Sequence, residues 1–294
     1  MIFGFFIGKR NPKLSENIAT PLIRYGIPLS LMGLLLKEGI DFDLIKTALL
    51  AFLSIGFLMF LINLIPIFKK RLNNYSLQLA GLIGNTSFLG IPIAIALLPT
   101  KTINFTIGFD LGTTLFAWIF GPFFLKKQTE INNNLNLKEL SNALLNSPAS
   151  RGVMGVLVLY FLKLDVIVGN FLWIPARIVI VLAIIVVGTR LGIITNNKTK
   201  IFILNKGTKY ALFLKLIILP LIIFIISKYL DFNPYQTSAV VLQAGTPTAI
   251  STILMAESYK INQEIAAKIL FATTLLSIIT IPILNYLINV DYLK

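Results

Sequence analysis

Long apolar runs recur along nearly the whole chain and are separated by short polar stretches. A helix needs roughly 17 to 25 mainly apolar residues to cross a hydrocarbon core about 30 Å thick, and in lipid it satisfies its own backbone groups. The runs predict transmembrane helices at residues 17–36, 44–68, 75–98, 103–125, 150–162, 167–193, 210–229, 237–255 and 264–290. Residues 1–8 would span only about 12 Å as a helix, so we expect a truncated first helix or a half-helix there.

Composition supports a membrane protein and narrows the available chemistry. Hydrophobic residues make up 56% of the 294 residues and charged residues 13%, far from the balance of a soluble domain. The formal net charge is +14, but Lys and Arg gather in short clusters between apolar runs, so we do not expect a nucleic-acid partner. The chain has no Cys and no His, which removes disulfides, thiol catalysis, a His proton relay and the usual zinc sites.

The placement of positive charge sets the expected topology. Loops rich in Lys and Arg stay cytoplasmic, and they alternate with poorer loops along the chain: the rich ones span 9–13, 69–71, 126–151, 190–209 and 260–268. We therefore expect a multi-pass protein of the cell membrane with both termini on the outer side. The polar, Asn-rich stretch 126–148 is expected to be a cytoplasmic linker between one half, 1–125, and the other, 149–294.

The two halves share a weak internal similarity. Residues 112–122 align with residues 272–282, with Thr, Thr, Leu, Ile and Pro in register, and nearly the same offset places Gly84 on Gly245. Many transporters are built from inverted repeats, and an odd number of segments in each half forces the second half to enter the bilayer from the opposite side. The expected fold is an all-α integral membrane protein of about ten transmembrane helices, arranged as two inverted five-helix repeats. The rival interpretation is two unrelated helices that both end near a proline.

Two predicted helices are interrupted by small polar residues, Gly and Pro. Gly relaxes the backbone and Pro removes a donor, and irregular backbone at membrane depth is tolerated where protein or a water-filled cavity satisfies it. Half-helix N-termini would then attract a carboxylate, and freed carbonyls could hold a cation. We expect helix breaks at Gly90, Pro92 and Pro247, and a substrate site formed by Gly84, Asn85, Thr86, Ser87, Gln243, Gly245, Thr246 and Thr248. The competing explanation is close helix packing by small residues, with prolines that merely kink.

Three ionisable residues lie inside apolar runs: Arg24, Asp110 and Arg177. Charges inside a membrane are expensive and usually functional, so an Arg could pair with Asp110, which could also bind an ion, or balance an anionic substrate. Both arginines could instead extend toward a membrane surface. Lys215 is expected to be an interfacial residue of its helix.

The stretch Gly84 to Pro92, which reads GNTSFLGIP, resembles a motif of the auxin efflux carrier family, which includes bacterial malonate and malate carriers and the plant PIN transporters. Looser support comes from residues 256–259, 146–148 and 188–192, and from Pro282, so the resemblance covers nearly the whole chain. It implies a crossover of broken helices four and nine that holds the substrate carboxylate, with Asn85, Pro92 and Pro247 at motif positions. Ser87 stands where a Gly is common, and the first helix is short. The resemblance says nothing of a coupling ion.

These observations favour a secondary active transporter, a permease that moves a small organic anion such as a carboxylate by alternating access. The alternative is a sodium- or proton-coupled symporter or antiporter of the same inverted-repeat architecture. An enzyme is not expected, because the sequence offers no paired carboxylates, metal-ligand cluster or nucleophile–base motif. The expected partners are the organic anion, the lipid bilayer and, as one option, a second copy of the chain. No cofactor is expected beyond a coupling ion, Na⁺ or H⁺.

Overall fold

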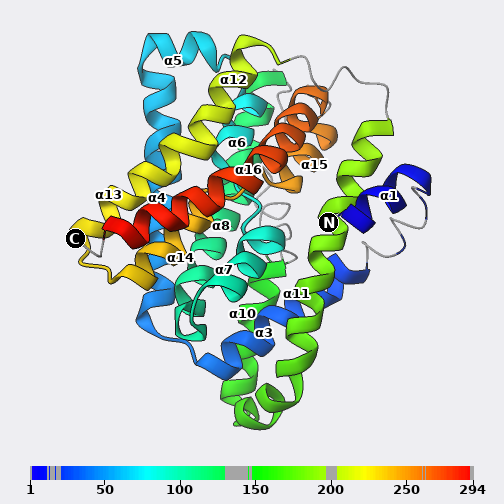
Figure 1. Ribbon diagram of the computed structural model, residues 1–294, viewed down its shortest axis with the longest axis vertical. Coiled ribbons are helices and arrows are strands. Elements are labelled where there is room, and N and C mark those ends of the chain that lie inside the picture. The colour runs from blue at the N-terminus through cyan, green and yellow to red at the C-terminus, as the bar shows by residue number, and fades with distance from the viewer. Residues whose placement is uncertain are drawn as a thin grey trace.

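In the computed structural model the described residues, 2–11, 13, 17, 21–129, 145, 148–196, 204–259, 261 and 263–291, fold almost entirely as helices (Figure 1). The first half contains α1 (Ile2–Arg10), η1 (Leu22–Gly26), α3 (Ile27–Glu38), α4 (Phe42–Leu64), α5 (Pro66–Arg71), α6 (Tyr75–Leu82), η2 (Thr86–Gly90), α7 (Ile91–Leu97), η3 (Thr100–Thr102) and α8 (Ile103–Thr129). The second half contains α10 (Pro148–Phe161), α11 (Asp165–Asn196), α12 (Lys206–Phe213), η4 (Leu214–Ile218), α13 (Leu219–Tyr229), α14 (Pro234–Ala244), α15 (Ile250–Ser258) and α16 (Gln263–Asp291).

Among the described helices, five stretches are long and apolar enough to cross a membrane: Phe42–Leu64, Thr100–Leu125, Asp165–Ile193, Lys206–Tyr229 and Glu264–Asn289. Two shorter apolar helices are Thr86–Leu97 and Ser150–Phe161. Large apolar side chains such as Phe57, Phe60 and Ile278 are exposed on the outer faces of α4 and α16, as expected where lipid rather than water is the solvent. The all-α membrane architecture is confirmed, whereas the number of ten helices stays a prediction.

The helices pack into two groups. The first consists of α1, α3, α10 and α11, which lie against one another on one side of the molecule (Figure 1). The second consists of α4 to α8 and α12 to α16, and it contains a large buried apolar cluster. Gly8 lets α1 approach α11 closely, since a Cβ at this position would lie 2.0 Å from the carbonyl oxygen of Thr189. Small residues play this part in helix contacts within membranes.

Three π-helical segments precede a proline in the same way. η1 is followed by Ile27-Pro28, η2 by Ile91-Pro92 and η4 by Leu219-Pro220, with each proline in the first turn of the next helix. Proline lacks an N–H and clashes with the carbonyl four residues earlier in a regular helix. The wider π turn changes this register, so the helical run passes the proline without a break.

This arrangement corrects the predicted breaks at Gly90 and Pro92. Gly90 has φ −62° and ψ −50°, and residues 86–97 are helical throughout. The first helix opens earlier, at Ile83 to Asn85, where Ile83 and Asn85 leave the helical region. The break at Pro247 is found as expected, since residues 245–249 separate α14 from α15.

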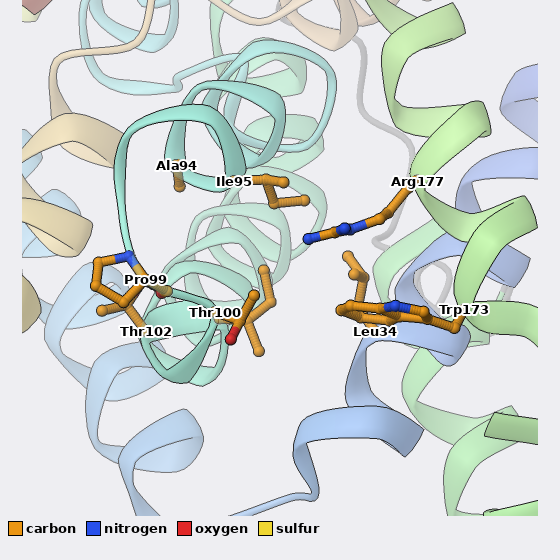
Figure 2. Close-up of a pocket in the computed structure, with 9 residues that line it drawn as sticks. Leu34, Ala94, Ile95, Pro99, Thr100, Thr102, Trp173 and Arg177 are labelled. Atoms are coloured by element: carbon orange, nitrogen blue, oxygen red, sulfur yellow. Dashed lines mark hydrogen bonds between the residues drawn. The ribbon is translucent and has the colours of Figure 1, made fainter. Parts of the chain in front are cut away.

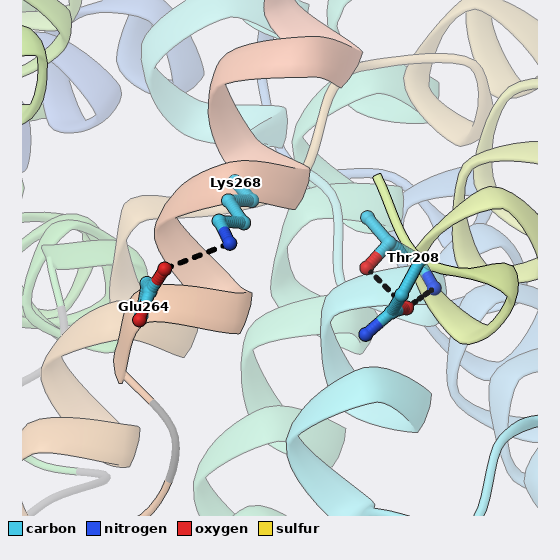
Figure 3. Close-up of polar contacts among 4 residues, drawn as sticks. Thr208, Glu264 and Lys268 are labelled. Atoms are coloured by element: carbon cyan, nitrogen blue, oxygen red, sulfur yellow. Dashed lines mark hydrogen bonds and ion pairs between the residues drawn. The ribbon is translucent and has the colours of Figure 1, made fainter. Parts of the chain in front are cut away.

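Several other boundaries also follow from local chemistry. The run predicted at 44–68 divides at Ile65, because a residue before proline is pushed toward extended backbone, and Pro66 then starts α5. Asn205 caps α12, where its side chain accepts hydrogen bonds of 2.8 Å from the Thr208 N–H and 2.9 Å from its hydroxyl (Figure 3). The same view shows the ion pair of 2.7 Å between Lys268 and Glu264 in the first turns of α16.

The two halves share an order of elements. In each, a long helix (α4, or α12 to α13) is followed by an interrupted helix (α6 to α7, or α14 to α15) and then by another long helix (α8, or α16). α8 continues into the predicted linker 126–148 as far as Thr129, and most of the remainder of that stretch lies outside the described residues. The inversion of one half relative to the other stays a prediction.

Candidate functional site

The two interrupted helices meet at their breaks. Gly84 and Thr248 form an antiparallel bridge, in which the Asn85 N–H donates to the Pro247 carbonyl at 2.7 Å and the Ala249 N–H donates to the Ile83 carbonyl at 3.0 Å. Each break thus supplies backbone partners that the other has lost, which satisfies irregular backbone at membrane depth. The two interruptions, which lie in opposite halves of the sequence, form one structural unit.

Threonine hydroxyls strengthen this crossing from within the protein. The Thr248 hydroxyl donates to the Ala80 carbonyl at 2.6 Å, and its N–H donates to the Thr273 hydroxyl at 3.0 Å. The Thr246 hydroxyl donates to the Gln243 carbonyl at 2.7 Å. Thr246 and Thr248 are fully buried, so their polar groups stabilise the break and are already occupied.

A cavity of about 140 Å³ lies beside the crossing. Its lining comes from both breaks and from α8: Ile83, Gly84, Asn85, Thr86, Ser87, Phe88, Thr113, Thr114, Ala117, Trp118, Ala249, Ile250 and Ser251. Of the predicted site residues, Gly84 to Ser87 line this cavity, whereas Gln243, Gly245, Thr246 and Thr248 do not. A cavity of about 150 Å³ can hold a benzene molecule, so this one suits a molecule of a few carbon atoms.

Two helix starts face the cavity. The helix Thr86–Leu97 begins directly after the first break, its N-cap residue Asn85 makes no side-chain capping hydrogen bond, and Asn85 to Phe88 line the cavity. α15 begins at Ile250, which lines the same cavity with Ser251. The first N–H groups of a helix have no partner within it, and the positive end of the helix dipole lies there. The cavity therefore offers an electropositive environment without a charged lining residue.

Asp110 lies behind the cavity wall. It is fully buried in α8, and its Oδ1 accepts hydrogen bonds from the hydroxyl of Thr86 and, at 2.6 Å, from that of Ser87. Oδ2 has no partner within the described part of the chain. A buried polar atom without a partner points to a bound proton, ion or water. Asp110 thus couples the cavity-lining hydroxyls to a group that can bind a cation.

The arginines proposed as partners of Asp110 lie elsewhere. Arg24 and Arg177 are exposed, whereas Asp110 is fully buried, and no ion pair joins them in the described residues. Arg24 lies over the ring of Tyr25, and its carbonyl accepts a hydrogen bond from Arg151. The expected pairing is wrong because the two arginines belong to the group of α1, α3, α10 and α11, and Asp110 faces the other group.

Arg177 instead points across the gap between the two groups of helices. Its guanidinium lies 4.5 Å from the centre of the Trp173 ring and extends from α11 toward Ile95 of α7 (Figure 2). Arg177 and Trp173 line one side of a small pocket together with Leu34. Residues of α7, η3 and α8 line its other side. The side chain therefore brings a positive charge to the boundary between the two groups.

Gln243 is buried without partners for its amide. Neither Nε2 nor Oε1 makes a hydrogen bond in the described residues, and a Cβ on Gly90 would lie 2.0 Å from Oε1. Gly90 is therefore needed for contact with Gln243 rather than for a helix break.

Lys215 was expected at the interface and is instead buried at the crossing. Only 1% of its surface is exposed, and Nζ donates to the Ala244 carbonyl at 2.5 Å. A Cβ on Gly84 would lie 2.9 Å from this Nζ. Lys215 lies five residues before Pro220, within the π segment that precedes this proline.

Comparisons with known proteins point to membrane transport. A family model described as membrane transport protein matches residues 173–285, a region that includes Lys215 and the second break. An uncharacterized transporter from Methanocaldococcus jannaschii is 22% identical over 213 residues, which cover 72% of this chain and 68% of that protein. The chain is therefore similar to membrane transport proteins, in line with the resemblance to the auxin efflux carrier family.

Both matches are to transport proteins, and together with the long apolar helices they indicate a transporter embedded in the lipid bilayer, with a small molecule as its substrate. These matches point to transport rather than to catalysis.

Proposed function

We propose that this transporter is a secondary carrier that moves a small organic anion, such as a carboxylate, by alternating access. The observation that carries the proposal is the cavity at the paired breaks, lined by two helix starts and by the neutral donors Asn85, Thr86 and Ser87. Helix N-termini bind anions, and neutral donors orient a carboxylate without the cost of a buried charge. The cavity volume limits the ligand to a few carbon atoms.

The two groups of helices support alternating access. The cavity lies within the group that contains both breaks, and the pocket around Arg177 lies between that group and α3 and α11. Relative motion of two rigid groups around a fixed site is the common mechanism of such carriers. We include in the proposal two inverted repeats, 1–125 and 149–294, both termini on the outer side, and association of two copies as an option. Labelling of single introduced cysteines from each side of sealed vesicles tests the topology, and light scattering of the purified protein tests the oligomeric state.

Asp110 favours a second candidate, in which transport is coupled to Na⁺ or H⁺. Its Oδ2 is buried without a partner, and its Oδ1 binds the hydroxyls of Thr86 and Ser87. A cation at Oδ2 would therefore influence the geometry of the cavity lining. Uptake by proteoliposomes under imposed sodium or proton gradients separates the candidates, because rates that respond to neither gradient would remove the coupled one.

The main test begins with thermal unfolding of the purified protein in acetate, lactate, malonate, succinate and malate. An anion that raises the unfolding midpoint is then used in proteoliposome uptake with the variant Asn85→Ala. We expect uptake to fall to the level of empty liposomes with a normal unfolding midpoint, because Asn85 lines the cavity and its side chain caps nothing. Asn170→Ala on the exposed face of α11 is the matched control. Unchanged uptake by Asn85→Ala would contradict the proposed site.

A further inference from the structure

Lys215 is a fully buried lysine beside the crossing of the two breaks. It lies in η4, and its Nζ donates a hydrogen bond of 2.5 Å to the carbonyl of Ala244, the last residue of α14 before the second break. Moving a charge from water into such surroundings is unfavourable by several kcal/mol unless it is compensated. A backbone carbonyl satisfies a donor but brings no negative charge.

No carboxylate of the described residues forms an ion pair with Lys215. The buried carboxylate of Asp110 accepts its hydrogen bonds from Thr86 and Ser87 instead. A charge that is retained inside a membrane protein without an ionic partner is a strong indication of function. We therefore expect a bound anion, rather than one of the described residues, to supply the compensating negative charge.

Gly84 connects Lys215 to the cavity. It lines the cavity, and a Cβ added to it would lie 2.9 Å from Nζ of Lys215 and 2.4 Å from Oγ1 of Thr246. The ammonium group thus lies directly behind the wall of the cavity, separated from its interior by the backbone of one glycine. Electrostatic interactions act across such a thin, poorly solvated layer with little screening.

We propose that Lys215 supplies the positive charge that makes the cavity selective for an anion over a neutral molecule of the same shape. The inference rests on the proposed function, which assigns the cavity to a small organic anion. Lys215 does not touch the ligand; it acts on it through the cavity wall at Gly84. The helix starts and neutral donors fix the orientation of the carboxylate. Lys215 makes binding depend on the negative charge of that carboxylate.

The test compares malonate with malonamide, its neutral diamide, as stabilisers of the purified full-length protein in thermal unfolding. Lys215→Gln removes the charge and keeps a donor for the Ala244 carbonyl, whereas Lys215→Arg keeps the charge. Lys209→Gln removes the same charge from an exposed position in α12. Succinate with succinamide provides a second pair of the same design.

We expect malonate to raise the unfolding midpoint of the wild type, Lys215→Arg and Lys209→Gln, with malonamide much less effective. Lys215→Gln should need about fiftyfold more malonate, the size expected of a unit charge roughly 7 Å away at an effective dielectric constant near 20, and should respond to both compounds alike. A purely structural lysine would lower the unfolding midpoint of Lys215→Gln without changing the preference for malonate.

Each contrary result has a distinct meaning. Equal responses of the wild type and Lys215→Gln to malonate overturn the inference and leave the proposed function standing. Equal stabilisation of the wild type by malonate and malonamide overturns it without any variant, even where Lys215→Gln fails to fold. A wild type that responds to none of the carboxylates named for the main test overturns the proposed function, and the inference falls with it.

Discussion

The backbone N–H of Asn85 donates a hydrogen bond of 2.7 Å to the carbonyl of Pro247, and thereby joins the two interrupted helices at their openings. The proline lacks an N–H but keeps its acceptor, and the opened first helix leaves a donor without its helical partner. Residues from opposite halves of the chain therefore complete each other's backbone bonding. Substitutions at this crossing should affect the fold and the cavity together.

Gly84→Ala should show this effect most directly. The added methyl group would lie 2.4 Å from Oγ1 of Thr246 and 2.9 Å from Nζ of Lys215, so the two breaks must separate or the lysine must move. Overpacking of this kind costs about 1 to 3 kcal/mol. We expect a lower unfolding midpoint and weaker ligand stabilisation.

Gly56→Ala in α4 is the control for this substitution, because its methyl group would meet only a Phe116 side-chain atom, at 3.3 Å. It should leave the unfolding midpoint nearly unchanged, since alanine also favours a helix more than glycine does. Equal midpoints for Gly84→Ala and Gly56→Ala would contradict the close approach at the crossing.

The crossing also shows what the sequence could and could not predict. Gly and Pro within apolar runs marked both openings, since these residues weaken helices wherever they occur. The location of the first opening was wrong by several residues, because a π turn before Pro92 relieves the clash that a regular helix would suffer. The cavity-lining role of Asn85 could be expected from its neighbours.

Lys215 could not be placed from hydropathy alone. A lysine in an apolar run extends to the surface in most membrane helices, and only the three-dimensional packing of α12 to α13 against the crossing shows that this one is enclosed. The contact of Arg177 with Trp173 follows from their spacing of four residues on one helix, whereas the direction in which Arg177 points depends on helix rotation, which length and composition do not determine.

The contact between Gly90 and Gln243 leads to a prediction about coupling. Gly90→Ala would place a methyl group 2.0 Å from Oε1 of Gln243 and should destabilise the protein by about 1 to 3 kcal/mol. The same change in a Gln243→Ala background should cost much less, because the clashing atom is gone. A double-mutant cycle by thermal unfolding measures the coupling, expected at about 0.5 to 3 kcal/mol; additive effects would show that the two residues do not touch.

Asp110→Asn should remove any coupling of transport to a cation gradient without lowering the stability of the protein. Asparagine keeps an oxygen for the hydroxyls of Thr86 and Ser87 and removes a buried ionisable group, so stability should be unchanged or higher. If transport depends on a cation, the variant should take up substrate at the same rate with and without a sodium or proton gradient. Uptake by proteoliposomes measures this.

The control for this change is Asp165→Asn in the first turn of α11, outside the group that contains the breaks. It should retain any response to a gradient that the wild type has. Full retention of that response in Asp110→Asn as well would exclude Asp110 as the coupling group.

Arg177→Ala should slow the capture of an anion rather than abolish binding. Arg177 lies twelve residues beyond Asp165, or about 18 Å along the helix, so an exposed side chain there faces the gap between the two groups instead of a headgroup region. We expect several-fold lower uptake at low ionic strength, with the difference shrinking above about 0.15 M salt. Trp173→Phe keeps an aromatic ring beneath the guanidinium and should have a smaller effect. A loss that does not depend on salt would argue against long-range attraction.

The two backbone bonds of the crossing restrict how the protein can move. Separating the breaks would leave the Asn85 and Ala249 donors and the Ile83 and Pro247 acceptors without partners, and each such group costs several kcal/mol where water is absent. The four half-helices, α6, α7, α14 and α15, should therefore move as one unit. The shape of the cavity between them should then stay the same when the protein changes conformation. Under the proposed alternating access, a ligand arriving from either side of the bilayer would meet the same atoms, so the direction of net transport would follow the gradients of the substrate and of any coupled ion rather than two different binding sites.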